Sequence, residues 1–397
     1  MKKLLQLKKR GSAITLVMIV VVLLISTGMG LLNLGLKSRT ISIRTTSDIA
    51  ARCAADAGLA KALFEMNEKL KVKPWNDSTL PLETEISLPY CDAVYSYTVT
   101  NDSAAGSYTL QSTGTSGQSQ RTVSCTLKLQ GPFEAAIFTE GFINLNSSAE
   151  VDWYNYDASD ANMKVGTNST ADGSVELASS AIIKGDVAVG AGGDPDTGIV
   201  LGGSAIIEGQ TSALTEEVEL LPITVPEAID SLPSGGDIKN NTTISSSGKY
   251  SSIDLGNSET VLISGDVTLY ITGDITLGNS AELQIEPDAS LTLYLGGDFE
   301  GKNSSAVNNE TQDPKSLQIY GLDSCEELRF KNSSDLFGAI YAPNADVIMN
   351  NSADVYGAVV SKSFDMRNSG VFMYDASLRD SSINEELVRF EIKRWHE

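Results

Sequence analysis

Histidine is almost absent from this chain of 397 residues, in which His396 is the only one. The four cysteines lie far apart, at Cys53, Cys91, Cys125 and Cys325. Zinc sites and disulfide frameworks need more such residues at closer spacing, and histidine is the commonest general acid and base. The sequence therefore disfavours histidine-based catalysis, zinc chemistry and a disulfide scaffold.

Positive charge is scarce after the first ten residues. The chain has 29 Lys and Arg against 51 Asp and Glu, a net charge of −22. Five of the basic residues lie in the first ten positions, so the remainder is more acidic still. An acidic surface disfavours binding to nucleic acid or anionic lipid and keeps an exposed protein soluble. We expect no nucleic-acid partner.

The long apolar run of this sequence lies at its N-terminus. Residues 11–36 carry no charge over 26 positions, and about 20 apolar residues suffice for a helix to cross a bilayer. The basic residues before the run predict a cytoplasmic N-terminus, with all that follows outside. A secretory signal has a shorter apolar core and a small-residue cleavage site, which is not found near residues 33–38. We expect a single-pass membrane protein of the inner membrane, and a plain signal anchor is the alternative.

Lys8-Lys9-Arg10-Gly11, directly before the apolar run, resembles the leader of a type IV prepilin. The resemblance implies that residues 1–11 are a leader, which prepilin peptidase cuts between Gly11 and Ser12, and that residues 12–36 form the transmembrane helix. Alanines and leucines at helical spacing continue the helix to about residue 70. We expect one face of this extension to cover a sheet: Ile49, Ala50, Cys53, Ala57, Ala60, Leu63 and Phe64.

The stretch Ala51-Arg-Cys-Ala-Ala-Asp-Ala-Gly-Leu-Ala-Lys-Ala62 resembles the Ala-Ala-Glu-Ala-Gly-Leu segment of PilX-type minor pilins and pilus assembly proteins, with Asp56 in place of glutamate. Major pilins carry a glutamate at the fifth mature position, where this chain has Leu16. A carboxylate in a membrane must be paired, so its absence implies a different place in the fibre. The resemblance implies a minor or tip subunit of a pilus or a type II secretion pseudopilus. Its partners would be prepilin peptidase, other minor pilins and the inner-membrane assembly platform.

Residues 37–130 predict a small pilin-like domain of one helix and an antiparallel sheet. Pro74 ends the helix, and Pro81 and Pro89 indicate a linker. Alternating apolar residues then predict strands over 93–100, 107–113 and 121–129. A hairpin register that places Cys125 opposite Thr109 makes a Cys91–Cys125 disulfide less favourable than two free cysteines.

A seven-residue pattern, apolar-x-(Asn/Ser/Gly)-Ser-x-x-apolar, recurs after Gly131. The copies begin at Leu145, Leu177, Leu201, Leu255, Leu277, Gly301, Phe330, Met349 and Met366. The serine sets the alignment, so the independent test is the last position, which is apolar in every copy. With 41% apolar residues, chance would give this result roughly 3 times in 10,000.

The spacing of the copies suits the coils of a right-handed parallel β-helix, and a jelly roll or sandwich is the rival fold. The fold class expected is thus mainly β, with a long N-terminal helix, a small α+β sheet and a solenoid over 131–397. Asparagine or glycine would take a left-handed backbone at each corner, and stacked asparagines would form a ladder. The ladder residues are Asn257, Asn279, Asn303, Asn332, Asn351, Asn368, Ser258, Ser280, Ser333, Ser352 and Ser369.

Two segments lie outside this repeat. Residues 211–237 are a proline-rich insertion beside the coils, and the apolar residues over 388–395 would cap the last coil. The region from Phe133 to Trp395 is similar to an uncharacterised β-helical domain often found behind PilX-type N-termini. That resemblance is carried by Gly301–Asn309, Asp313–Gly321, Gly338–Asn344, Tyr356–Ala358 and Tyr374–Asp375.

Catalytic and metal-binding patterns are weak in this sequence. Glycoside hydrolysis needs two carboxylates in a groove, and the candidates are Asp186, Asp266, Asp274, Asp298, Asp346 and Asp365. They lie in turns or beside glycine, where aspartate is favoured for backbone reasons. The acidic turns 157–160 and 194–196 lack calcium-loop spacing, and no phosphate-binding loop occurs. We expect no enzyme, metal or cofactor.

The alternative function is a signal-anchored β-helical protein that binds or cleaves polysaccharide. A binding module of that kind would have a solvent-facing row of aromatic side chains. Only one aromatic cluster is visible in the sequence, formed by Trp153, Tyr154 and Tyr156.

Overall fold

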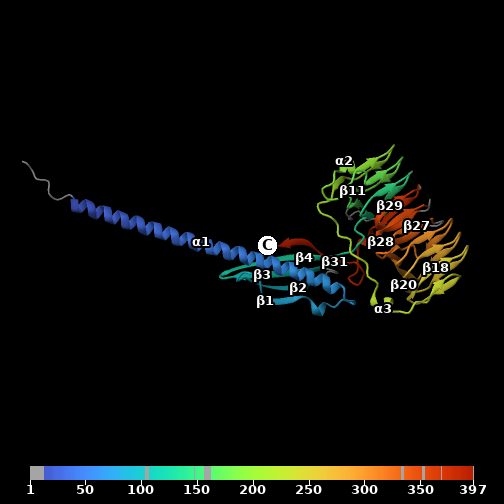
Figure 1. The fold of residues 1–397 in the computed structure, drawn as a ribbon, viewed down its shortest axis with the longest axis horizontal. Helices are drawn as coiled ribbons and strands as arrows, with labels where there is room; N and C mark the ends of the chain where they lie inside the picture. Colours follow the sequence, from blue (N-terminus) through green and yellow to red (C-terminus); the bar gives the residue numbers. More distant parts are fainter. Residues whose placement is uncertain are drawn as a thin grey trace, which may run out of the picture. The chain divides into compact units, whose positions relative to one another are not determined.

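A computed structural model of the chain describes residues 13–102, 107–146, 148–155, 162–331, 335–350, 354–367 and 369–396. The chain divides into two compact units, Met1–Leu129 with Phe390–Glu397, and Gln130–Arg389. The fold is mainly β with a long N-terminal helix, as the sequence predicts (Figure 1).

The first unit consists of one long helix and a five-stranded sheet. Its elements are α1 (Ala13–Leu70), the 3-10 helix η1 (Asp77–Thr79), β1 (Leu82–Ser87), β2 (Val94–Asn101), β3 (Ser107–Ser116), β4 (Ser119–Gln130) and β31 (Arg389–His396). The strand order is β1-β2-β3-β4-β31, and the predicted antiparallel pairing of β2 with β3 and of β3 with β4 is confirmed. Figure 1 shows the C-terminal half of α1 along this sheet and its N-terminal half projecting beyond it.

The sheet differs from the predicted meander in register and in extent. Leu110, not Thr109, lies opposite Cys125. Cys125 is buried and Cys91 is exposed, and both are free thiols. The segment predicted to be a linker contributes β1, which pairs with β2.

The face of α1 that covers the sheet is not the predicted one. The buried residues are Ala51, Ala54, Ala55, Gly58, Leu59, Ala62, Met66 and Leu70, whereas Ile49 and Phe64 are exposed. Small residues are selected here because the helix backbone touches the sheet. A Cβ atom at Gly114 of β3 would lie 2.0 Å from the carbonyl oxygen of Ala51. The prediction was wrong because it assigned the larger apolar side chains to the core.

The C-terminal strand belongs to the first unit, which corrects the predicted boundary of 131–397 and the predicted cap over 388–395. Strand β31 lies beside β4. Phe390 is 2% exposed, and its ring centroid lies 5.1 Å from that of Tyr108 and 5.7 Å from that of Trp75. Alternation correctly indicates a strand, but it does not indicate which sheet the strand joins.

The second unit is built from parallel strands in two groups. The first group contains β5 (Ile137–Thr139), β6 (Ile143–Leu145), β7 (Glu150–Tyr154), β8 (Lys164–Thr167), β9 (Val175–Leu177), β10 (Ile182–Ile183), β11 (Asp186–Val189), α2 (Pro195–Gly198), β12 (Ile199–Leu201), β13 (Ile206–Ile207) and β14 (Thr211–Ala213). Each strand pairs in parallel with the strand three places later, as in β5–β8, β8–β11 and β11–β14.

The second group keeps this three-place pairing from residue 237 to residue 330, after which the strands pair one or two places apart. It contains β15 (Asp237–Ile238), β16 (Thr242–Ile244), β17 (Gly248–Tyr250), β18 (Ser252–Leu255), β19 (Thr260–Ile263), β20 (Asp266–Ile271), β21 (Ile275–Leu277), β22 (Glu282–Ile285), β23 (Ser290–Leu295), β24 (Phe299–Gly301), β25 (Ala306–Asn309), η2 (Pro314–Ser316), β26 (Leu317–Gly321), β27 (Glu327–Phe330), β28 (Leu336–Met349), β29 (Val355–Met366), β30 (Val371–Asp375) and η3 (Ala376–Arg379). The predicted parallel strands are confirmed. The described residues include no closed sheet, and the right-handed β-helix stays a prediction.

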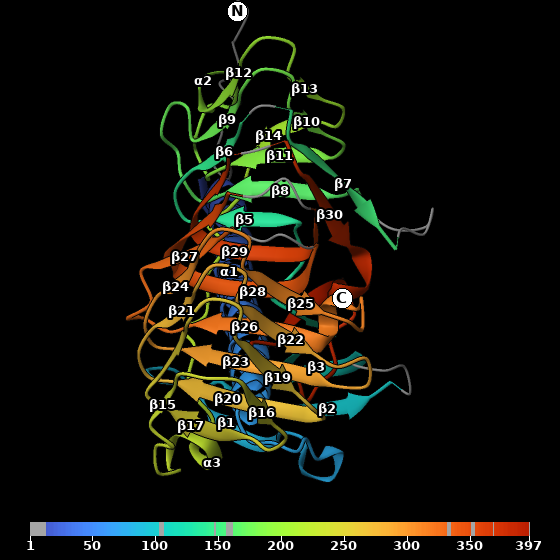
Figure 2. The same cartoon turned by 90° about the vertical axis from the view of Figure 1, so that its right-hand side faces the viewer.

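The chain enters this stack of strands in its middle. Strand β29, near the end of the unit, pairs in parallel with β5 and β6 at its start, and β30 pairs with β7. Figure 2 shows β29 beside β5, with the first group on one side of them and the second group on the other. The two groups therefore extend in opposite directions from the point where they meet.

The register that aligns the sequence repeat is the register of the strands. The first positions of the copies lie opposite one another, as do Leu145 and Leu177, Leu177 and Leu201, and Leu255 and Leu277. The last positions do the same in Val151 and Ile183, and in Val261 and Leu283. A slip of one residue would turn every side chain to the other face.

The corner of the repeat differs from the prediction in one respect. Serine, not asparagine, has the left-handed backbone in three copies, with φ of 60° at Ser258, 57° at Ser280 and 56° at Ser304. Asparagine contributes through its side chain instead. Oδ1 of Asn257 accepts the backbone N–H of Asn279 at 2.9 Å, and the two amides lie 3.3 Å apart.

Two further ladder residues, Asn303 and Ser369, lie in the described part of the chain. The backbone carbonyl of Asn303 accepts the N–H of Ser280 at 3.2 Å, and Ser369 is exposed. Five ladder residues lie outside the described part of the chain: Asn332, Ser333, Asn351, Ser352 and Asn368.

The proline-rich insertion is shorter than predicted because Thr211–Ala213 form β14 within the sheet. Residues 214–236, here called the crossover segment, lead from β14 to β15 and include α3 (Glu227–Asp230). Its apolar residues pack against the core of the unit, and Asn168 exchanges two hydrogen bonds with the backbone of Val218, at 2.9 and 3.0 Å. The segment lies beside the strands, as predicted.

Candidate assembly surface on the N-terminal helix

The first half of α1 is an exposed apolar rod. Residues 13–36 carry no charge, and at 1.5 Å per residue they span about 36 Å, more than the roughly 30 Å of a bilayer core. In the described residues, α1 is the one helix long and apolar enough to cross a membrane. Leu16 is 63% exposed. Gly11 and Ser12 lie outside the described residues.

The second half of α1 has two apolar faces. One contacts the sheet through small residues, and the other consists of the side chains predicted to be core. We call the exposed members of this second face the outer stripe: Ile49, Cys53, Ala60 and Phe64. Phe64 is 64% exposed. Between the uncharged residues 13–36 and the outer stripe, charged residues at 37, 39 and 44 alternate with the exposed Ile41 and Ile43, so α1 presents apolar side chains in both of its halves.

Charged groups border the outer stripe on the second half of α1. Arg121 of β4 donates two hydrogen bonds to the carboxylate of Asp48, at 2.6 and 2.8 Å. These bonds lower the pKa of Asp48. Asp56 pairs with Arg52 one turn earlier at 3.6 Å. Exposed pairs of this kind add little stability, so their main effect is to orient the helix.

A second carboxylate orders the loop after α1. Asp77 accepts hydrogen bonds from the indole of Trp75 and the hydroxyl of Tyr108, each at 2.8 Å, and from the amide of Asn101 at 3.0 Å. The bonds from Trp75 and Tyr108 are the largest causes of the lowered pKa of Asp77. The loop is thereby tied to β2 and β3.

The first unit should lose stability in acid through Asp77. Because its folded pKa is lowered, the ionised group stabilises the fold above its ordinary pKa, and this stability is lost as the pH falls through the lowered pKa, below about pH 4. In Asp77→Asn the decrease between about pH 5 and pH 2 should be smaller than in the wild type. Amide exchange in β3, measured across this pH range, gives the stability of the wild type and of the variant at each pH. The same decrease in both proteins would contradict the role assigned to Asp77.

The carboxylates considered for glycoside hydrolysis hold the turns of the second unit. Oδ1 of Asp298 accepts the backbone N–H groups of Glu326 and Glu327, each at 2.9 Å. Asp274 does the same for the N–H of Asp298 at 3.0 Å, and Asp186 for that of Gln210 at 2.8 Å. The other three accept side-chain donors: Asp266 from Ser290, Asp346 from Ser363, and Asp365 from Asn146 and Arg367. Each of these carboxylates thereby joins neighbouring strands or turns.

Two further sequence candidates have local roles. Asp194 caps α2 by accepting the N–H of Asp196 at 3.0 Å, and turn 157–160 lies outside the described residues. Trp153 contacts Tyr374, with ring centroids 5.7 Å apart. Tyr154 instead meets Tyr356, with centroids 4.9 Å apart, and Tyr156 is not described.

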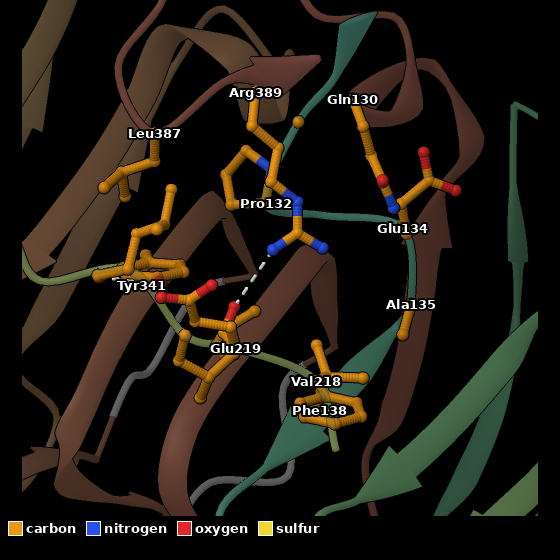
Figure 3. A pocket seen from close by; sticks show the side chains of 14 residues that line it. Gln130, Pro132, Glu134, Ala135, Phe138, Val218, Glu219, Tyr341, Leu387 and Arg389 are labelled. Atoms are coloured by element: carbon orange, nitrogen blue, oxygen red, sulfur yellow. Dashed lines mark hydrogen bonds between the residues drawn. The ribbon is translucent and has the colours of Figure 1, made fainter. Parts of the chain in front are cut away.

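A small pocket marks where the chain enters and leaves the second unit. Its lining includes Pro132, Tyr341 and Arg389 together with Val218–Leu221 of the crossover segment (Figure 3). Arg389 donates to the carbonyl of Glu219 at 3.3 Å, and Tyr341 donates to that of Leu221 at 2.9 Å. The cavity holds about 70 Å³, well below the 300 Å³ or more of typical ligand pockets. Its polar groups join segments of the chain to one another.

Part of the chain matches a known protein family. Residues 203–381 match a family described as a domain of unknown function, DUF7305. No curated protein sequence matches the chain. Among solved structures, the chain is similar to the competence-associated pilin ComZ from Thermus thermophilus, with 14% identity and a TM-score of 0.28 over 88% of this chain and 97% of that one. A TM-score this low establishes no common fold.

Proposed function

We propose that this protein is a minor or tip subunit, or an assembly factor, of a type IV pilus-like fibre of the PilX kind. Its main support is α1, which is apolar and exposed through its membrane-length half and keeps the outer stripe on the half that covers the sheet. A plain membrane anchor needs apolar side chains only within the bilayer. Apolar side chains beyond it suit a helix that packs beside other pilin helices in a fibre.

The second unit would be the part displayed outside the cell. We propose that its parallel strands form a right-handed β-helix, supported by the three-strand period of the pairing and by the repeat that lies in register along it. The carboxylates that hold its turns suit a structural role, and we propose that the unit has no catalytic site. The N-terminus would lie in the cytoplasm, and prepilin peptidase, other minor pilins and the inner-membrane assembly platform would be its partners.

Processing at Gly11 tests this proposal. After co-expression with prepilin peptidase, mass spectrometry should show a chain that begins at N-methylated Ser12. Gly11→Val should leave the leader in place, because the peptidase cuts after glycine in the family this leader resembles. A wild-type chain that keeps Met1 in the presence of an active peptidase would overturn the proposal in favour of a plain signal anchor.

An adhesive role has one specific observation in its favour. Phe337 and Tyr356 stack on adjacent strands, with centroids 4.3 Å apart and planes 9° apart, and Tyr154 meets Tyr356 edge-on. Tyr154 and Tyr356 are half-buried, so each offers part of its ring to solvent. Aromatic faces of this kind can stack against sugar rings. Retention of the wild type on immobilised polysaccharide, reduced in Tyr356→Ala, would support this role.

A further inference from the structure

One end of the second unit leaves its core open. Leu201 of β12 occupies the first position of the repeat, and the residue opposite it, Leu177, is 1% exposed. Leu201 itself is 50% exposed. The reason is that β12 is the last strand in its row of paired strands, where its described pairing is with β9 alone. Ile207 of β13 likewise lies opposite the buried Ile183 and is itself only half-buried.

The other end of the unit is covered. Its terminal strands hold Ile238 and Ile244, and both side chains are buried. The crossover segment continues the edge of β17, because Gly235 donates to the carbonyl of Lys249 at 2.8 Å and Gly236 accepts from Ser251 at 2.9 Å. Lys249 also binds the carboxylate of Asp230 in α3 at 2.9 Å. Figure 2 shows α3 at this end and β12 and β13 at the opposite one.

The open end differs from the rest of the molecule in charge and in hydrogen bonding. Residues 199–213 include a single charged residue, Glu208, in a chain that is 20% charged with a net charge of −22. The described pairings of β12, β13 and β14 lie on one side of each strand, with β9, β10 and β11. Unpaired strand edges beside exposed apolar side chains favour association with another chain. Two acidic molecules can approach here with little repulsion.

We propose that this open end, formed by β12, β13 and β14, binds the same end of a second copy of the chain. The opposite end cannot be the partner surface, because the crossover segment and α3 cover it. A head-to-tail array is thereby excluded, and contact of like ends gives a closed two-fold dimer. Such contact buries Leu201 and Ile207 against their own counterparts.

The size of the surface predicts a weak dimer. Stable interfaces involve about 20–30 residues a side, and the terminal strands with their connections, residues 199–213, provide 15. The contact should therefore form in the micromolar range. It does not rest on the pilin function, since a chain that keeps its leader would have the same end.

Hydrogen exchange of the full-length protein in detergent micelles tests the contact. Amides of residues 199–213 should exchange at least ~10-fold more slowly at about 100 µM than at about 1 µM protein. In the variant Leu201→Lys this concentration dependence should disappear, because one charge per copy would be buried without a partner. Leu201 is 50% exposed, so the variant should fold normally, as unchanged exchange in β20 and β23 would verify.

The control is Val72→Lys, which places a lysine at an exposed position of the first unit. It should retain the concentration dependence of the wild type. Exchange of residues 199–213 that is independent of concentration in the wild type would overturn the proposal. So would a dimer that persists in Leu201→Lys, since α1 or another surface would then hold it.

Discussion

Replacing Phe390 by alanine should reduce the free energy of unfolding of the first unit by about 3–5 kcal/mol, the usual range for a buried phenylalanine. Phe390 is 2% exposed and packs between Trp75 and Tyr108. Its backbone N–H also donates to Oδ1 of Asn67 in α1 at 2.7 Å. The side chain thus joins the helix, the loop and the sheet, and its loss leaves a cavity among all three.

Native-state hydrogen exchange of amides in β2 and β3 measures this effect in the intact chain. Trp395→Ala is the matched control, because Trp395 lies on the same strand but is 58% exposed. The control should change the exchange of these amides by less than about 0.5 kcal/mol. Equal effects of the two variants, or a loss confined to the second unit, would contradict the placement of β31 in the first sheet.

Gly114→Ala should displace α1 from its sheet at a cost of about 3 kcal/mol or more. The added Cβ would lie 2.0 Å from the carbonyl oxygen of Ala51 and 2.5 Å from the backbone nitrogen of Ala55. Both are helix backbone atoms, so no side-chain rotation relieves the overlap. Amides of residues 51–66 should therefore exchange faster, and trypsin should cut the helix sooner.

Gly35→Ala is the opposite case on the same helix. Nothing lies within 4 Å of a Cβ placed at Gly35, and alanine favours the helix over glycine by about 1 kcal/mol. This variant should leave residues 51–66 as protected as in the wild type. Normal protection in Gly114→Ala would show that helix and sheet are farther apart than the structure places them.

The repeat could be predicted to the residue because its signal is local and periodic. Leu145 and Leu177 face each other since apolar residues flank a short polar corner at the same distance in each copy, and a slip by one residue would expose them. The corner was predicted less well. Either residue of an Asn-Ser pair can take the left-handed backbone. The hydrogen bonds between Asn257 and Asn279, which distinguish the two, join different copies of the repeat.

The helix face and the last strand could not be read from local pattern. Phe64 and Ala54 lie on different apolar faces of α1, and the sheet selects the face with small side chains because its backbone approaches so closely. Phe390 lies in β31, which pairs with β4, a strand that ends far earlier in the chain, at Gln130. Both outcomes depend on contacts between distant parts of the chain, and a single sequence holds no direct record of those.

The central point of chain attachment in the second unit has an evolutionary consequence. Strands β5 and β29 meet in the middle of the stack. Its two ends are therefore formed by internal segments of the chain, and the segments that enter and leave the unit lie between them. Duplication or deletion of a repeat at either end would lengthen or shorten the stack without moving residues 130 and 389. Related proteins can therefore differ in the number of repeats on each side while they keep the same attachment, provided that the crossover segment changes its length to match.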